Sequence, residues 1–179
     1  MLELIRTAIR RRKPATHELF DTVSMEFRVA MWDLDHNLHL NNAKYLKFMD
    51  KCRLEHSIVT GLLDRMIKAH CNAVVANTEV AYVRELRPYQ RFTENTHILG
   101  WDDKYMYYEQ QFESQGKLHT HALLRVIHFY NSKVISPQAV QEITGLNMDS
   151  PDMPSYIEDW KTMLQAKRRY TEQEFAARR

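Results

Sequence analysis

One long amphipathic helix, followed mostly by strands, is the feature that most limits how this chain can fold. Between positions 45 and 59, apolar side chains recur every three or four residues, and charged side chains fall between them. This period predicts a helix over residues 42–59 with a single apolar face. Asn41 or Asn42 suits its N-cap, and Gly61 is expected to mark its end.

Strand-like segments surround this helix. Residues 25–32 alternate loosely ahead of it, and β-branched and aromatic residues are frequent behind it. The strands expected after the helix are 73–86, 91–101, 105–115 and 118–130, with hairpin turns at 100–104 and 114–117. An antiparallel sheet that curls around the helix would bury its apolar face, so we expect an α+β architecture.

Two further helices are expected near the C-terminus. Ser136-Pro137 predicts the start of a short helix that Gly145 ends. Ser155 and Glu158 form a capping-box pattern, which predicts a last helix through about residue 174. We therefore divide the chain into a basic N-terminal segment 1–20, a single domain 21–150 and a helical tail 151–179.

Net positive charge is confined to the two ends of the chain. Residues 1–15 carry five basic side chains against one acidic, and residues 161–179 carry six against two. The part between them is acidic, although the whole chain has a formal net charge of +2. A protein that binds nucleic acid concentrates positive charge on its folded surface, so we expect no nucleic-acid partner.

The basic run at residues 10–13 follows several apolar residues. A short amphipathic helix there would favour weak contact with an anionic membrane surface, and the alternative is a solvated, partly ordered terminus. No secretory signal is expected, because the basic residues follow the apolar ones and no small-residue cleavage site is present. Two cysteines, Cys52 and Cys71, do not make a disulfide framework, so a reducing cytoplasm is the expected compartment.

The scarcity of glycine excludes several kinds of site. The chain has only four glycines, and they lie far apart. Neither a dinucleotide-binding G-x-G-x-x-G sequence nor a P-loop can be written, and the G-x-S-x-G elbow of α/β-hydrolases is absent too. Any chemistry must therefore come from another arrangement.

A dense polar segment directly precedes the long helix. Residues 33–45 contain two carboxylates, two imidazoles and three carboxamides. One interpretation is turn and capping chemistry alone. A second is a metal site drawn from Asp33, Asp35, His36 and His39, although zinc and iron need three or four ligands in a defined geometry and no distant Cys/His pair completes the set. A third is a carboxylate acting on a carbonyl group that the free N–H groups of the helix start polarise.

The spacing of this segment resembles a known family. The pattern Asp33-x-Asp35-x-x-x-His39-x-Asn41-Asn42-x-x-Tyr45 is similar to the D-x-D-x-x-G-H-V-N-N-x-x-Y segment of hotdog-fold acyl-CoA thioesterases of the 4-hydroxybenzoyl-CoA thioesterase branch. Residues 79–86 resemble that family's second strand. Residues 38–46 and 99–103 resemble more closely the thioesterase superfamily member six branch and its bacterial relatives. The resemblance covers about residues 22–150.

The resemblance implies a hotdog fold, in which a strongly curved antiparallel sheet wraps one long helix. It also implies a homo-oligomer, either a dimer or a dimer of dimers, with active sites at the dimer interface. The implied reaction is hydrolysis of an acyl-CoA to a free acid and coenzyme A. No metal and no separate cofactor are expected, because coenzyme A is part of the substrate.

The family's catalytic carboxylate falls on Asp35, which would act as nucleophile or general base. Its carbonyl-polarising backbone N–H falls near Asn42, and His39 is expected beside them in the catalytic group. The resemblance, together with the affinity of guanidinium groups for the phosphates of coenzyme A, predicts a set of substrate-binding side chains, which comprises Asn41, Tyr45, Asp33, Arg84 and Arg87. The chain departs from the pattern at Leu38, where the family has glycine and where leucine restricts the backbone.

Two alternatives remain open at this point. The same fold could serve a non-catalytic acyl-CoA-binding or scaffold protein, which the bulk of Leu38 favours and the intact Asp35 disfavours. The reaction could instead be that of an acyl-carrier-protein thioesterase or of a hotdog hydratase, although the histidine-and-acid arrangement of a hydratase cannot be written here.

Overall fold

The structure is a computed structural model that describes residues 15–178. The basic run at residues 10–13 and its predicted membrane contact lie outside the described residues. In the described part, no helix is both long and apolar enough to cross a bilayer.

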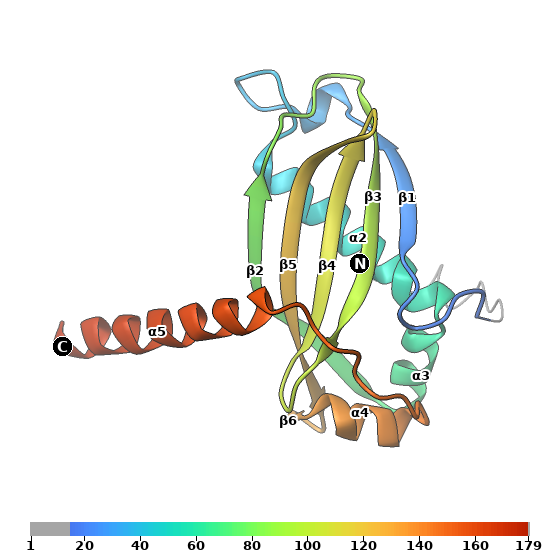
Figure 1. The fold of residues 1–179 in the computed structure, drawn as a ribbon, viewed down its shortest axis with the longest axis vertical. Helices are drawn as coiled ribbons and strands as arrows, with labels where there is room; N and C mark the ends of the chain where they lie inside the picture. The colour runs from blue at the N-terminus through green and yellow to red at the C-terminus, as the bar shows by residue number, and fades with distance from the viewer. Residues whose placement is uncertain (1–14, 179) are drawn as a thin grey trace.

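One curled antiparallel sheet wraps a central helix, α2 (Asn42–Val59), as Figure 1 shows. The strands follow the order β1-β3-β4-β5-β2, and a short sixth strand pairs with β5. Their bounds are β1 (Val23–Arg28), β2 (Cys71–Tyr82), β3 (Arg91–Trp101), β4 (Met106–Ser114), β5 (Lys117–Tyr130) and β6 (Lys133–Ile135). Every pairing is antiparallel.

The inner face of the sheet and one face of α2 form the main core. Tyr45, Met49, Cys52 and His56 are the buried residues of the helix, and they recur every three or four positions as an amphipathic helix requires. Tyr45 and Met49 pack against inward-facing side chains of β3, β4 and β5, and the ring of His56 lies 6.0 Å from that of Tyr108 on β4. The predicted α+β hotdog fold, with the helix over 42–59, is therefore confirmed.

A second, smaller core lies on the outer face of the sheet. It forms where the C-terminal helix α5 (Tyr156–Ala177) begins. Ile157 and Trp160 pack there against Tyr107 of β4 and Leu123 of β5, and the ring centroids of Tyr107 and Trp160 lie 6.3 Å apart. Helix α2 and the first turns of α5 therefore pack on opposite faces of one sheet.

The end of the long helix near Gly61 is confirmed, whereas the start of α5 at Ser155 differs in detail from the expectation. α2 ends at Val59, and a separate helix, α3 (Leu62–Lys68), follows Gly61, which has a φ of 73°. A further helix, α4 (Pro137–Thr144), starts at Ser136 as predicted, and its cap hydroxyl accepts the Ala139 N–H. Ser155 makes no side-chain capping bond. Instead, the Tyr156 hydroxyl donates to Glu109 of the sheet over 3.0 Å.

The first strand and the first predicted hairpin also end elsewhere. β1 stops at Arg28, because Met31–Asp33 turn into a 3-10 helix, η1. Gly100 lies inside β3 and not in the hairpin turn, which follows from Asp102. A Cβ atom at Gly100 would lie 2.7 Å from the Ser150 Oγ and 2.9 Å from the Met153 Cγ. Glycine is therefore needed where the segment from α4 to α5 crosses the sheet.

Candidate active site

The predicted catalytic carboxylate lies on a tight hairpin loop that leads into α2. The Asp35 N–H donates to the His39 carbonyl over 3.0 Å, and the Leu38 N–H donates back to the Asp35 carbonyl over 3.1 Å. An isolated β-bridge between Leu34 and Leu40 closes the loop. The loop is thus fixed by its own backbone, so its side chains project from a defined frame.

The Asp35 carboxylate is held on both of its oxygens. Its Oδ1 accepts the Asn37 N–H over 2.8 Å, and its Oδ2 lies 3.2 Å from the His39 Nδ1. The Asp35 side chain keeps 16% of its surface exposed. A carboxylate that is oriented but still reachable from solvent can act as a base or a nucleophile.

A free backbone donor lies at the start of α2, seven residues further on. Asn41 is the N-cap, and its side-chain oxygen accepts the Ala43 N–H over 2.9 Å. The Lys44 N–H donates to the Asn41 carbonyl over 2.8 Å. Within residues 15–178, the Asn42 N–H has no acceptor. The helix start therefore offers one unpaired N–H at the positive end of the helix dipole.

Asp33 ties the loop to the first turn of the helix. Its carboxylate is 2.8 Å from the Lys44 ammonium, and its carbonyl accepts the Asn41 N–H over 2.9 Å. The structure thus gives Asp33 and Asn41 partners within the protein. Their contact with a substrate stays a prediction.

Tyr45 lies beneath the loop in the aromatic part of the core. It is buried, with ring centroids 5.1 Å from Tyr82 and 5.0 Å from Phe112. Burial raises the pKa of Tyr45, and the nearby charge of Asp35 raises this pKa slightly further. Tyr45 is therefore a neutral core residue close to the carboxylate, and its contact with a substrate stays a prediction.

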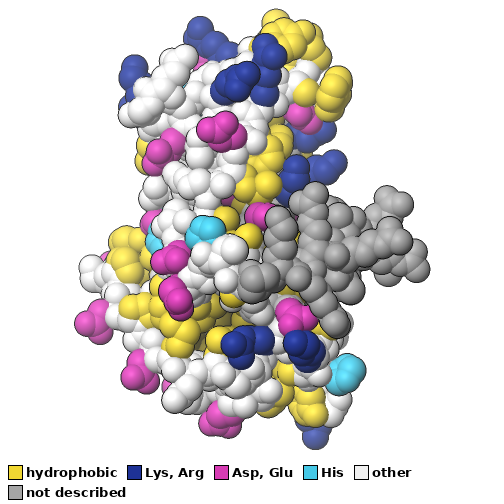
Figure 2. Space-filling view, turned by 90° about the vertical axis from the view of Figure 1, so that its right-hand side faces the viewer, with side chains coloured by type: hydrophobic (Ala, Val, Ile, Leu, Met, Phe, Trp, Pro, Cys, Tyr) yellow, Lys and Arg dark blue, Asp and Glu magenta, His cyan; other side chains and the backbone are white. Residues whose placement is uncertain are grey.

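The connection between β2 and β3 brings Arg84 and Arg87 to the same end of the molecule. The Leu40 N–H donates to the Leu86 carbonyl over 2.8 Å, which joins this connection to the loop. Arg84 donates to the Leu118 carbonyl over 2.6 Å, and Arg87 forms an ion pair with Glu85 at 2.7 Å. Figure 2 shows Lys and Arg side chains gathered at this upper end, beside hydrophobic ones.

Leu38 occupies the position where the related motif has glycine, and the backbone there explains the preference. Its φ is 61°, in the left-handed region that favours glycine. Its side chain is 65% exposed and points away from the core. The substitution therefore strains the backbone, at a cost of about 1–2 kcal/mol, and does not fill the loop.

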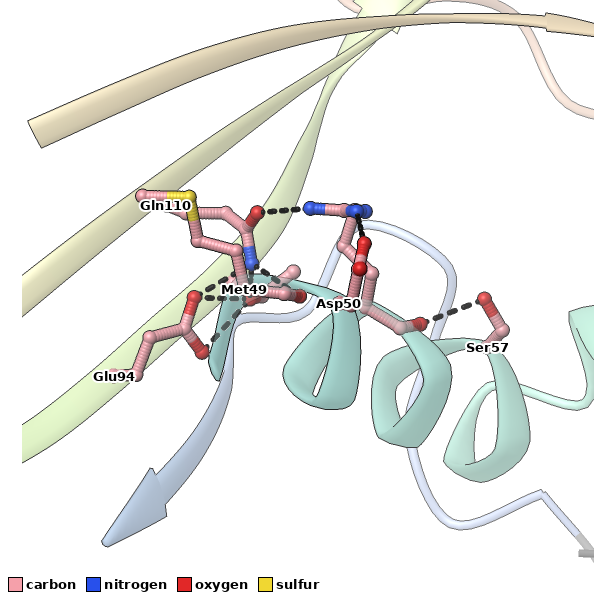
Figure 3. Close-up of polar contacts among 7 residues, drawn as sticks. Met49, Asp50, Ser57, Glu94 and Gln110 are labelled. Atoms are coloured by element: carbon pink, nitrogen blue, oxygen red, sulfur yellow. Dashed lines mark hydrogen bonds and ion pairs between the residues drawn. The ribbon is translucent and has the colours of Figure 1, made fainter. Parts of the chain in front are cut away.

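A buried polar layer in the core was missed by the sequence prediction. Figure 3 shows Glu94 of β3 and Gln110 of β4 pointing toward each other beside Met49 of α2. The Gln110 amide donates to Glu94 over 2.6 Å and to the Met49 carbonyl over 3.1 Å. Arg53 donates to the Gln110 carbonyl oxygen over 2.7 Å. The sequence did contain a signal for this layer, because Glu94 and Gln110 are polar residues at positions of β3 and β4 that face the core.

A second polar cluster lies on the outer face of the sheet. Glu109 is 2.7 Å from the His121 Nε2 and 3.5 Å from the His97 Nε2. Hydrogen bonding to His121 lowers the pKa of Glu109 and, reciprocally, raises that of His121. Tyr156 covers this cluster. Within residues 15–178, no group of three or more His, Cys, Asp or Glu side chains is arranged to hold a metal ion.

The fold and the loop together define the class of protein. A long helix wrapped by a curled antiparallel sheet is the fold that this chain shares with a solved probable thioesterase. Residues 29–160 match the thioesterase-like superfamily. The chain belongs to this superfamily and is a thioester hydrolase by class, as the sequence predicted.

Individual relatives agree with this assignment. The chain is 31% identical over 154 residues to Protein THEM6 from Xenopus laevis, across 84% of this chain and 72% of that one. The probable thioesterase YbaW from Escherichia coli matches with a TM-score of 0.63 and 20% identity, over 67% and 94% of the two chains. The protein SAV2348 from Staphylococcus aureus, solved with CoA, matches with a TM-score of 0.60 and 16% identity, over 80% and 96%. These two structures show the fold alone.

Proposed function

We propose that the protein hydrolyses acyl-CoA thioesters with Asp35 and the backbone N–H of Asn42. One observation carries the proposal: a half-exposed hairpin loop holds an oriented carboxylate, and a helix start with an unpaired N–H follows it directly. A hydrolase needs both a group that brings water or itself to the carbonyl carbon and a donor for the developing oxyanion.

The chemistry then follows from these two groups. The thioester oxygen accepts a hydrogen bond from the Asn42 N–H as negative charge builds on it. Asp35 either removes a proton from the attacking water, or attacks the carbonyl carbon itself to form an anhydride that water opens. On both routes the C–S bond breaks, and the sulfur takes up a proton from the water and leaves as the thiol of coenzyme A. On the general-base route water supplies the new oxygen of the acid, whereas on the nucleophilic route water that opens the anhydride at the Asp35 carbonyl leaves its oxygen in Asp35. His39, 3.2 Å from Asp35, orients the carboxylate.

Recognition of the substrate is proposed to use the upper end of the molecule. Arg84 and Arg87 are exposed there and suit the phosphates of coenzyme A. Met31, Trp32 and Leu38 are more than half exposed close to the loop and offer apolar surface to an acyl group.

A homodimer joined through β2 is part of the proposal. β2 is a 12-residue strand at the edge of the sheet, and its outer side has no partner strand within residues 15–178. A second copy that pairs its own β2 there would continue the sheet and cover this edge. A dimer of dimers would need a further contact.

Release of free thiol from acyl-CoAs of differing length and aromaticity tests the proposal. The Asp35→Asn protein keeps the shape of the side chain but removes the charge, and the Asp103→Asn protein makes the same change in an exposed turn. We expect turnover in the wild type and in Asp103→Asn, and loss in Asp35→Asn. Tight acyl-CoA binding without turnover of any substrate would support a binding protein instead. Oxygen-18 in Asp35 after a single turnover in labelled water would mark the nucleophilic route.

A further inference from the structure

The two edges of the sheet differ in how well they resist pairing. β1 has six residues and carries Glu26 and Arg28. β2 is twice as long, contains no Lys, Arg or Pro, and exposes Val74 and Val75. Proteins usually protect an edge strand by shortness, charge or proline. β2 therefore has fewer of the features that prevent pairing, and it is the edge at which we expect another strand to pair.

Helix α5 crosses this edge and continues beyond it. Its first turns are anchored on the outer face of the sheet by Ile157 and Trp160, and by Lys161, whose ammonium is 3.1 Å from Asp102. Figure 1 shows the helix passing in front of β2 and projecting clear of the sheet. Residues 165–178, which we call the arm, are all exposed.

Any strand that pairs with β2 would extend the sheet in the direction in which the arm points. The arm lies on the outer side of the sheet, so the outer face of the added chain would come beneath it. Rotation about a two-fold axis perpendicular to the sheet does not exchange its two faces. The outer face of the second copy would therefore lie on the same side as the outer face of the first. Each copy would then receive the arm of the other, as an isologous interface requires.

The charges on the arm fit this position. Lys167, Arg168 and Arg169 are consecutive on the arm, whereas the body of the chain is acidic. Glu79 lies on β2 opposite Leu123, a residue of the outer core, so its side chain belongs to the outer face. Helix α5 is anchored at Leu123, level with Glu79 of its own β2, so a two-fold axis beside Glu79 would bring Glu79 of each copy close to the other copy's arm.

We infer that the arm is an intermolecular clasp: residues 165–178 of one copy lie over the outer face of β2 and β5 of a second copy, with the basic run near Glu79. The inference rests on the β2 dimer of the proposed function. The clasp adds a contact on the outer face of the sheet. The Asp35 loop, by contrast, leads into α2, which packs on the inner face.

Dissociation on dilution, followed by analytical ultracentrifugation of the full chain, tests the clasp. The K167E/R169E protein should show a dimer Kd at least tenfold higher than the wild type, with unchanged helix content by circular dichroism. The K104E/K133E protein makes the same change of net charge at two exposed lysines outside the arm, and its Kd should stay within twofold. Adding Glu79→Lys to K167E/R169E should recover most of the loss. An arm variant with the Kd of the wild type would overturn the inference.

Photo-crosslinking gives a second, independent measurement. A benzoylphenylalanine at Tyr170, in a mixture of isotopically light and heavy copies, should yield mixed light–heavy products joined to β2 or β5. Products that are only intramolecular, or that map to β1, would refute the clasp, as would a chain that is monomeric at every concentration. Thiol release from acyl-CoA in the wild type reports on Asp35 separately, so failure of the clasp and failure of the hydrolase are distinguishable.

Discussion

Helix α2 has a carboxylate at its start and another against its middle, and the two are used in opposite ways. Asp35 precedes the helix in a loop that solvent reaches, and the Asn42 N–H beyond it is unpaired. Glu94 faces the middle of the helix and is fully buried. Thr96 and Gln110 both donate to it, over 2.8 Å and 2.6 Å. A polar side chain therefore does not by itself indicate an active site. The indication here is a carboxylate that solvent reaches, close to a backbone N–H without an acceptor.

The electrostatics of the buried layer follow from the same contrast. Burial raises the pKa of Glu94 to about 7, against hydrogen bonds from Cys52, Thr96 and Gln110 that lower it. Burial also lowers the pKa of Arg53. The layer joins β3 and β4 to α2, so we expect its residues to govern stability, whereas those of the loop govern rate.

The sharpest test of this contrast is Asp35→Asn. We expect turnover to fall by about 10³-fold, in line with the loss of a positioned acid–base group. The melting temperature should stay within a few degrees of the wild type, because the amide oxygen can still accept the Asn37 N–H. Steady-state kinetics and calorimetry measure the two effects. A large fall in stability would mean that Asp35, like Glu94, is a structural residue.

Gln110→Leu is the converse change. It leaves Glu94, Arg53 and the Met49 carbonyl without the amide that links them. The free energy of unfolding should drop by about 3 kcal/mol, as for other buried charges that lose a partner. Denaturant titration measures this, with Gln111→Leu, on the opposite face of β4, as the control. The folded fraction should turn over substrate at a rate within a few-fold of the wild type.

The pH dependence of stability isolates Glu94. Its pKa is raised on folding, so its protonated form is favoured in the native state, and its contribution to stability is lost as pH rises from about 4.5 to about 7. At about 1.4 kcal/mol per pKa unit, the wild type should lose roughly 2 kcal/mol relative to Glu94→Gln between pH 5 and pH 7. His56 and His128, whose pKa values burial lowers to about 4, act in the opposite sense. They are present in both proteins and cancel. A flat difference would contradict the raised pKa.

The smallest expected effect concerns the frame of the loop. Leu38→Gly should raise the free energy of unfolding by about 0.5–1 kcal/mol, because glycine adopts the left-handed backbone without strain but loses more entropy on folding. Leu38→Ala is the matched control and should bring no gain, since its Cβ keeps the strain. If both variants behave alike in thermal unfolding, the backbone is not the cause. Turnover should change less than twofold in either.

Local features of the site were predictable from the sequence. Asp35 and His39 are four residues apart, and the Asn41 cap and the helix that follows depend on neighbours in the chain. The resemblance of this motif to that of hotdog thioesterases predicted the family and the hotdog fold, and the helix and strand patterns predicted the α+β class. Short-range geometry is encoded in short-range sequence, so a motif suffices to locate it.

Several contacts that the sequence did not reveal depend on strand register, and others depend on segments far apart in the chain. Glu94 meets Gln110 only because Thr96 pairs opposite Gln110 across β3 and β4. Glu109 meets His121 through a similar alignment of β4 with β5. Gly100 was mistaken for a turn residue because the reason for it, Ser150, lies 50 positions later. Alternation predicts which face a residue occupies but not which residue stands beside it.

Gly100 has a further consequence for the second copy of the chain. The segment that it lets pass close to the sheet leads directly into α5, so it sets where the arm leaves the surface. An arm held in this way meets a neighbouring molecule at a high effective concentration, whereas the same residues on a loose tether would be diluted over a larger volume. A single hydrogen atom in place of a methyl group, more than 60 residues before the arm, would thus influence how strongly two chains associate.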